Sequence, residues 1–289
     1  MTRRRIAVLW HERDRGRDLH RYLITHLAEH WRSDGHAVRF LFGVDRFEPA
    51  DLVIVHVDLS IVPARYLDFA AHYPVAVNGR VQDIRRTRFS RILVRADDAY
   101  TGPVIVKSNA NHAGAPERSR AGLGVAALRW RVRQRIAALR RPADDVPPMF
   151  ATPLDYRVLE RAADVPAAWF GRPELVIERF LPEREGEAYA VRNYHFLGDR
   201  STCTRMVAPH PIVNGYTQVA MEPIEPDPVI ERLRHELGFD YGKFDYVMHD
   251  GEAVLLDANK TTGADGLPWT PDLEALRRHR ADGLYSFFS

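Results

Sequence analysis

The feature of this sequence that most constrains its fold is an alternation of short apolar runs with amphipathic segments over the first 80 residues. Apolar, β-branched runs predict strands at residues 5–10, 36–42, 51–57 and 75–78. Between them, residues 18–34 and 63–72 carry apolar side chains at helical spacing, and Gly35 suits the end of the first helix. Strands that alternate with helices predict a small open sheet of parallel type. No G-x-G-x-x-G motif follows the first strand, so a dinucleotide site is not indicated there.

The composition is that of a soluble globular protein and argues against several classes of function. The formal net charge is only +2, whereas a surface that binds nucleic acid normally brings a strong basic excess. No apolar run approaches the roughly 20 residues that span a bilayer, and we find no export signal. Cys203 is the single cysteine and cannot form an intrachain disulfide. We therefore expect a cytoplasmic protein with no nucleic-acid or membrane partner, and a homo-oligomer is compatible with the sequence.

Lysine is unusually rare in this chain. Of 41 basic residues only three are lysine, Lys107, Lys243 and Lys260, and the other 38 are arginine. A chain that uses arginine nearly everywhere is expected to keep lysine where a compact ammonium group is needed and a planar guanidinium does not fit. The alternative is that three lysines survive by chance. Their positions favour the first interpretation, because all three fall beside the motifs described next.

A predicted hairpin near the C-terminus carries the most specific signal. The apolar strand at residues 255–259 presents Asp257 and Asn259 on one face, and Asp245 lies on the partner strand. With a three-residue loop at 250–252, or with a bulge, Asp245 would face Asp257, whereas a strict two-residue turn would place them on opposite faces. We predict the facing arrangement. Two carboxylates and an amide oxygen suit a Mg²⁺ ion that bridges phosphate oxygens; the alternative is that Asp257 caps a turn and Asp245 is solvated.

Lys107 is the second candidate for phosphate chemistry. It interrupts an apolar strand at residues 103–107, where a cation that met no anion would be costly, so we predict a nucleotide phosphate as its partner. The alternative is a lysine whose stem reaches solvent. The polar, glycine-bearing segment 109–124 predicts a mobile loop over the phosphates. It leads into an arginine-rich amphipathic helix expected at 123–141, whose role the sequence leaves open.

Four motifs occur in the order and approximate spacing of one enzyme superfamily. They lie at residues 102–107, 176–182, 244–246 and 256–259. Over about residues 75–265 the chain resembles the ATP-grasp superfamily. The resemblance implies an α/β fold with three parts: a Rossmann-like open-sheet domain at 1–95, a small central subdomain at 96–180 that includes the loop 109–124, and an antiparallel-sheet subdomain at 181–289 that carries the metal ligands.

The resemblance also implies roles for residues around the nucleotide. Lys107 matches the lysine that contacts phosphate. A hinge between the two subdomains is implied to bind the adenine: Glu178, Arg179, Phe180 and Leu181. In it, backbone groups of Arg179 and Leu181 would read the adenine edge and Phe180 would pack nearby. Glu187 is implied to contact the ribose.

Further residues match the family's metal and substrate groups. Asp245, Asp257 and Asn259 match the magnesium ligands, and Asn259 thereby also contacts the nucleotide. Arg205 lies where the family often has an arginine near the γ-phosphate or acyl-phosphate. Lys260, with the threonines that follow it, is a candidate to hold the acyl-phosphate or the substrate carboxylate.

The chain departs from the family in three places. A second phosphate-reaching lysine would fall at residues 83–88, where this sequence has only Arg85, Arg86 and Arg88, and whether one of them replaces it stays open. The usual glutamate at position 257 is an aspartate. The stretch that links the N-terminal domain to Lys107 is short.

The function implied is that of an ATP- and Mg²⁺-dependent ligase. Such an enzyme activates a carboxylate of a small molecule or peptide as an acyl-phosphate, which an amine then attacks to form an amide or peptide bond. Two alternatives stay open: an ATP-dependent small-molecule kinase, and a nucleotide-binding module without chemistry. The sequence does not identify the carboxylate or the amine, because the residues that select substrates lie in variable loops.

Overall fold

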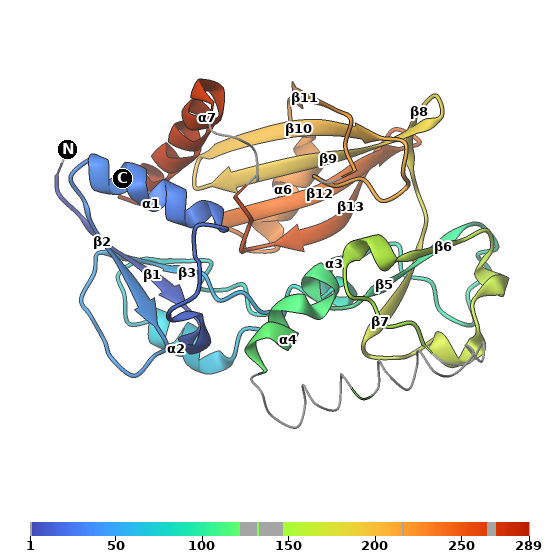
Figure 1. Ribbon diagram of the computed structural model, residues 1–289, viewed down its shortest axis with the longest axis horizontal. Helices are drawn as coiled ribbons and strands as arrows, with labels where there is room; N and C mark the ends of the chain where they lie inside the picture. The colour runs from blue at the N-terminus through green and yellow to red at the C-terminus, as the bar shows by residue number, and fades with distance from the viewer. Residues whose placement is uncertain (1, 122–131, 133–146, 216, 265–269, 289) are drawn as a thin grey trace.

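The computed structural model describes residues 2–121, 132, 147–215, 217–264 and 270–288 and has a mixed α/β fold built on three sheets (Figure 1). This confirms the expected fold class. The first sheet is parallel, in the order β2-β1-β3-β4, as predicted from the alternating pattern. Its elements are β1 (Arg5–Trp10), α1 (Leu23–Ser33), β2 (Ala37–Phe42), β3 (Leu52–Val55), α2 (Ala64–Ala70) and β4 (Ala76–Val77).

Both faces of the first sheet are covered, which explains why its central strands are apolar throughout. Alternate residues of β1 and β3, such as Val8 and Ile54, pack with α1, whereas their neighbours Leu9 and Val53 enter a second core with α2. Gly35 follows α1 with a φ of +88°, a left-handed conformation that glycine adopts without strain.

The second sheet has the order β6-β5-β7 and lies beside the first sheet and the third (Figure 1). Val104 and Val106 of β5 enter its own core, so the alternation turns Ile105 and Lys107 to the other face. The segment expected as a mobile loop at 109–124 instead forms a short 3₁₀ turn and α4 in its described part. Most of the arginine-rich helix expected at 123–141 lies outside the described residues. The elements here are α3 (Arg86–Phe89), β5 (Val104–Ser108), α4 (Ala115–Arg120), β6 (Arg157–Leu159) and β7 (Leu175–Arg179).

The third sheet is antiparallel, with the order β11-β10-β9-β12-β13 and with β8 paired to β9. One face is covered by α6, through a core that includes Phe244, Tyr246 and Ile230. The other face is turned toward the second sheet. Its elements are β8 (Glu183–Glu185), β9 (Ala188–Leu197), β10 (Arg200–Ala208), β11 (Ala220–Ile224), α6 (Pro228–Glu236), β12 (Tyr241–His249), β13 (Glu252–Asn259) and α7 (Pro271–Asp282).

The hairpin of β12 and β13 has both a two-residue turn and a bulge. Asp250 and Gly251 form the turn with φ values of +50° and +82°, and His249 pairs with Glu252. The register then shifts by one residue, with Leu256 as the extra residue, and Asp245 pairs directly with Asp257. The predicted facing arrangement is therefore confirmed, and the bulge produces it.

The first and third sheets share one hydrophobic core. Residues of β1, β3 and α1 pack with Leu197, Tyr241, Ala281 and Leu284 from the C-terminal half. The indole N–H of Trp31 in α1 donates to the carbonyl oxygen of Ala281 in α7 at 2.9 Å. Within the described parts of the chain, no helix combines the length and apolar character needed to cross a membrane.

Candidate active site

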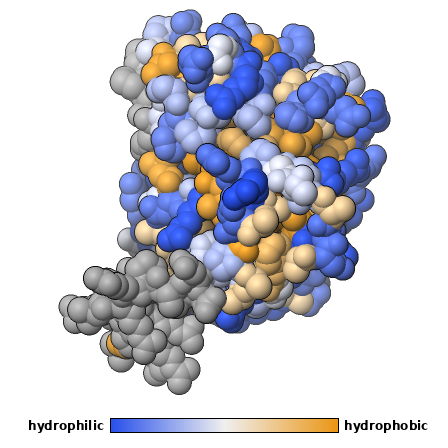
Figure 2. All heavy atoms as spheres, turned by 90° about the vertical axis from the view of Figure 1, so that its right-hand side faces the viewer, coloured by the Kyte–Doolittle hydropathy of each residue, from blue (hydrophilic) through white to orange (hydrophobic). Residues whose placement is uncertain are grey.

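A cavity of about 470 Å³ lies between the second and third sheets. Apolar side chains from four strands line it: Ile105, Val191, Val247 and Leu256. Polar and charged residues line it as well, among them Arg86, Lys107 and Asp257. Figure 2 views the molecule from the side of β6 and β8 and shows apolar surface between polar side chains on that face. A cavity with apolar walls and a few convergent polar groups is the usual form of a small-molecule site.

The three predicted metal ligands, Asp245, Asp257 and Asn259, all line the cavity. The Lys243 ammonium lies 2.9 Å from an Asp245 carboxylate oxygen, and the Asn193 amide donates to the same oxygen. Arg86 donates to Asp257 at 2.7 Å. Burial, together with the neighbouring Asp257 carboxylate, raises the pKa of Asp245 above its ordinary value, although Lys243 opposes this. Two paired carboxylates and an amide oxygen are a donor set that fits a hard divalent cation. Lys243 and Arg86 are the cations that contact the two carboxylates.

Lys107 lies in the cavity wall as predicted. Its ammonium is 2.7 Å from a carboxylate oxygen of Glu178, which is completely buried on the adjacent strand β7. Glu178 therefore holds the lysine from behind, and it does not itself line the cavity. The predicted direct contact of Glu178 with a nucleotide does not fit this position, and what the structure shows is an ion pair that holds Lys107.

Arg86 is the residue of the 83–88 segment that reaches the cavity. It is buried and donates to the carbonyl oxygens of Ser108 at 2.8 Å and Ala110 at 3.0 Å, besides its bond to Asp257. Arg85 instead pairs with Asp83, outside the cavity lining. The sequence showed three arginines where a lysine was expected, but their spacing alone did not distinguish which one turns inward.

Three of the four residues of the predicted hinge, 178–181, reach the cavity. Arg179, Phe180 and Leu181 line it. However, the backbone N–H of Arg179 donates to Ile92 and that of Phe180 donates to Pro103, at 2.8 and 2.9 Å. The Arg179 N–H therefore already has a partner within the protein, and adenine contacts through the other backbone groups of Arg179 and Leu181 stay a prediction. The Arg179 guanidinium stacks over the Tyr100 ring at 4.9 Å.

Besides Glu178, three predicted site residues do not line the cavity. Glu187 is exposed in the turn between β8 and β9. Lys260 is completely buried, and its ammonium donates to the carbonyl oxygen of Leu59 at 2.5 Å. Arg205 pairs with Arg192 across β10 and β9, whereas the next β9 residue, Asn193, turns its side chain to Asp245. Successive residues of a strand face opposite sides, so Arg205 lies on the far face of the sheet.

Arg205 forms ion pairs with glutamates on the far face of the third sheet. Arg205 lies 2.9 Å from Glu183 and 3.4 Å from Glu222, and Arg192 lies 3.0 Å from Glu183. These ion pairs connect β8, β9, β10 and β11 on the far face of the sheet. The prediction that Arg205 acts at the γ-phosphate is corrected by this placement.

No protein-family model and no curated protein matches the sequence. Solved structures do match over nearly the whole chain. An ATP-grasp RimK domain protein from Sphaerobacter thermophilus is 16% identical, with a TM-score of 0.48 and coverage of 98% of both chains. The D-cycloserine synthetase DcsG is 16% identical, with a TM-score of 0.46 and coverage of 97% of this chain and 99% of that one. D-alanine–D-alanine ligase from Bacillus anthracis is 9% identical, with a TM-score of 0.49 and coverage of 99% and 96%. The chain is thus similar along nearly its whole length to ATP-grasp and ligase structures. These low identities and TM-scores do not show an activity, so the function has to be inferred from the cavity of this chain.

Proposed function

We propose that this protein is an ATP- and Mg²⁺-dependent ligase that joins a carboxylate to an amine. The observation that carries the proposal is the convergence, in one cavity, of a facing carboxylate pair with two buried cations and an apolar slot. The carboxylates are Asp245 and Asp257, and the cations are Arg86 and Lys107. This combination is what a nucleoside triphosphate with a bound divalent cation requires: apolar walls for the base, positive charge for the phosphates and hard oxygens for the metal.

Each end of the cavity takes one part of the nucleotide. The base would lie between Ile105 of the second sheet and Val191 and Leu256 of the third, beside the hinge at Phe180 and Leu181. Lys107 and Arg86 would contact the phosphates. Asp245, Asp257 and Asn259 would hold Mg²⁺, which would supply positive charge against the phosphates. We propose the same division of the chain, at 1–95, 96–180 and 181–289, with the base between the second and third parts.

The protein's work in the reaction is to position groups and balance charge. The γ-phosphoryl group passes from ATP to a carboxylate oxygen of the substrate, which breaks the bond to the β-phosphate oxygen and yields ADP and an acyl-phosphate. The amine then attacks the acyl carbon, loses a proton and displaces inorganic phosphate. Lys107 and Arg86 hold the phosphates in line, and Lys243 adds a third cation beside Asp245. With its one cysteine buried and free, we place this activity in the cytoplasm.

The test is a screen for ADP release with Mg²⁺ over amino acids, peptides and small acids, each with and without an added amine. Mass spectrometry identifies the product of each hit. An amide with ADP and phosphate supports the proposal. A stable phosphorylated product would instead identify a kinase. ATP binding by calorimetry without ADP release from any substrate in the screen would identify a binding module.

A further inference from the structure

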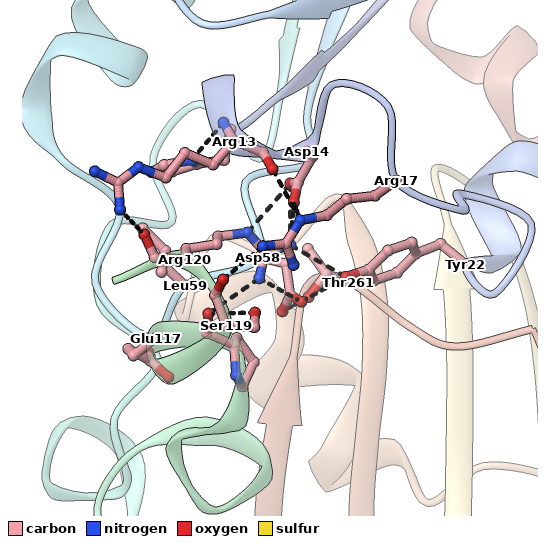
Figure 3. Close-up of polar contacts among 12 residues, drawn as sticks. Arg13, Asp14, Arg17, Tyr22, Asp58, Leu59, Glu117, Ser119, Arg120 and Thr261 are labelled. Atoms are coloured by element: carbon pink, nitrogen blue, oxygen red, sulfur yellow. Dashed lines mark hydrogen bonds and ion pairs between the residues drawn. The ribbon is translucent and has the colours of Figure 1, made fainter. Parts of the chain in front are cut away.

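A second group of charged residues, apart from the cavity, is buried where the first sheet meets α4 and the end of β13 (Figure 3). The Arg120 guanidinium of α4 is 2.8 Å from one Asp14 oxygen and 3.2 Å from an Asp58 oxygen. It also donates to the Tyr22 hydroxyl at 3.2 Å. All four residues are buried, with Asp14 only 1% and Arg120 only 3% exposed. Two carboxylates thus enclose one guanidinium out of contact with water.

The two carboxylates lie where open parallel sheets bind their ligands. Asp14 is four residues past the end of β1, and Asp58 is three residues past the end of β3. Since β1 and β3 are adjacent and parallel, both residues follow the carboxyl edge of the sheet. Ligands of open α/β sheets bind in the crevice at this edge. Here, in the structure, Arg120 fills that position.

A short chain of hydrogen bonds links this pair to the proposed metal site. The Thr261 hydroxyl donates to Asp58 at 2.9 Å, and the Thr261 backbone N–H donates to the Asn259 amide oxygen at 2.8 Å. Asn259 lines the nucleotide cavity. A group bound at Asp58 would therefore lie close to the phosphate end of the cavity, where the second substrate of a ligase must enter.

The chemistry of the pair selects for positive charge. Burial alone would raise the pKa of Asp58, but the Arg120 guanidinium and the hydroxyls of Tyr22 and Thr261 hold it below its ordinary value. The Asp58 carboxylate thus stays ionised and needs a cation as its partner. Arg120 comes from a helix of six residues, which a second bond attaches to the first sheet: Glu117 accepts from the Ser60 N–H at 2.7 Å. A cation from outside could make the same bonds that Arg120 makes.

We propose that Asp14 and Asp58 form a subsite for a positively charged group of the co-substrate, a guanidinium or primary ammonium, and that Arg120 occupies this subsite when no co-substrate is bound. Binding of a cation at this subsite does not depend on the proposed ligase function. Only the effect of the subsite on the reaction with the amine rests on that function. The preferred amine substrate then carries a second cationic group, held by the carboxylate pair while its reacting amine faces the phosphate end.

The first test is binding of methylguanidinium, with the uncharged methylurea as the matched ligand. We expect calorimetry to show methylguanidinium binding at least about 10-fold more tightly to the Arg120→Ala variant than to the wild type, where it must displace Arg120. Asp58→Asn in that background should weaken binding at least about 10-fold, the effect of one charged hydrogen bond. Methylurea should not bind. If Arg120→Ala fails to fold alone, methylguanidinium should restore its cooperative melting. Equal binding by wild type and variant, or no restored melting, would overturn the subsite.

The second test separates a substrate contact from a purely structural clamp. With the amine found by the ADP-release screen, Asp58→Asn should raise the KM for the amine at least about 10-fold and leave the KM for ATP unchanged. The control is Arg278→Ala, which removes an ion pair with Asp34 far from both sites and should change neither KM. An unchanged amine KM would overturn the proposal. Absence of ADP release would refute the ligase function, while the binding test would still decide whether the subsite exists.

Discussion

At the scale of single residues, the carboxylate of Asp257 is the group on which the proposed metal site most depends. It faces Asp245, lines the cavity and accepts a hydrogen bond from the buried Arg86. An amide of the same shape keeps that bond and loses the charge that a divalent cation needs. The consequences of this one charge and of the two predicted cations, Lys107 and Arg205, can be tested separately.

We expect Asp257→Asn to lower ADP release at least roughly 100-fold at low Mg²⁺, since even groups that only orient a metal ligand contribute about 10–100-fold. Raising the Mg²⁺ concentration should recover part of the loss. The unfolding free energy should fall by about 1–3 kcal/mol, because Arg86 keeps a weaker partner. The control is Asp250→Asn in the hairpin turn, where the side chain is 93% exposed. A Mg²⁺ dependence like that of the wild type would contradict the metal role.

Lys107 and Arg205 were predicted to act together, and the structure separates them. Lys107→Met should reduce turnover by roughly 100-fold or more, as expected for loss of a positioned phosphate contact. Arg205→Ala should leave turnover within about twofold and cost about 1 kcal/mol of stability, since Glu183 keeps Arg192 and the Met248 N–H as partners. Steady-state ADP release and urea denaturation measure both effects. A large loss of turnover in Arg205→Ala would return that residue to the site.

What the sequence predicted at this scale follows from local spacing. Asp257 and Asn259 are two residues apart on one strand, so their common face was predictable. Arg205 was misplaced because the face of a strand depends on register with its neighbours, which spacing along the chain does not contain. Arg86 was left among three candidates for the same reason: its inward direction is set by carbonyl oxygens of Ser108 and Ala110, 22 and 24 residues away.

At the scale of elements, strand alternation decides what β5 contributes. Val104 enters the core of the second sheet, and Ile105, its neighbour, lines the cavity. The strand and its lysine were predicted from sequence. The sequence allows either a bulge in β13 or a three-residue loop to bring the two aspartates face to face. It does not distinguish them, because a bulge and a longer loop shift the register in the same way. The short helix α4 was not predicted, since its six residues carry no apolar stripe and it is held by buried ion pairs.

The two faces of β5 give a matched pair of substitutions. Ile105→Trp should extend a ring into the space proposed for the base, raising the Kd for ATP at least about 10-fold while the protein melts near the wild-type temperature. Val104→Trp should overpack the core and lower the unfolding free energy by about 1–3 kcal/mol. Calorimetry with ATP and thermal melts distinguish them. ATP binding by Ile105→Trp at wild-type affinity would show that the base lies elsewhere.

At the scale of the whole molecule, the first and third sheets share one hydrophobic core. Leu197, Tyr241 and Ala281 share a core with Trp31 and the strands of the first sheet. The sequence predicted a separate N-terminal domain because its strands and helices alternate locally. It did not show that the C-terminal helix and the end of β9 would complete the core of that domain, since these residues are far apart in the sequence, for example 250 positions between Trp31 and Ala281.

His56 lies inside this shared region and makes the stability of the whole molecule depend on pH. It is completely buried, its ring packs at 4.3 Å from that of Trp10, and neither ring nitrogen has a hydrogen-bond partner among the described residues. Burial lowers its pKa to about 3 from an ordinary value of 6.5. Between these values the unfolded chain binds a proton that the folded protein does not. Stability should therefore fall as the pH falls below 6.5 and be unaffected by this residue above it.

The expected loss approaches about 1.4 kcal/mol for each pH unit below 6.5 and comes to about 2 kcal/mol between pH 6.5 and 4.5. His56→Leu removes the titrating group from an apolar site and should lose most of this part of the slope, so that the difference in unfolding free energy between pH 7 and pH 4.5 becomes smaller than in the wild type. His72→Gln, at an exposed position after α2, should keep the full slope. Urea denaturation at the two pH values measures all three proteins. Equal slopes in wild type and His56→Leu would mean that the ring is protonated, or reaches water, in the folded state, and that the shared core is open at His56.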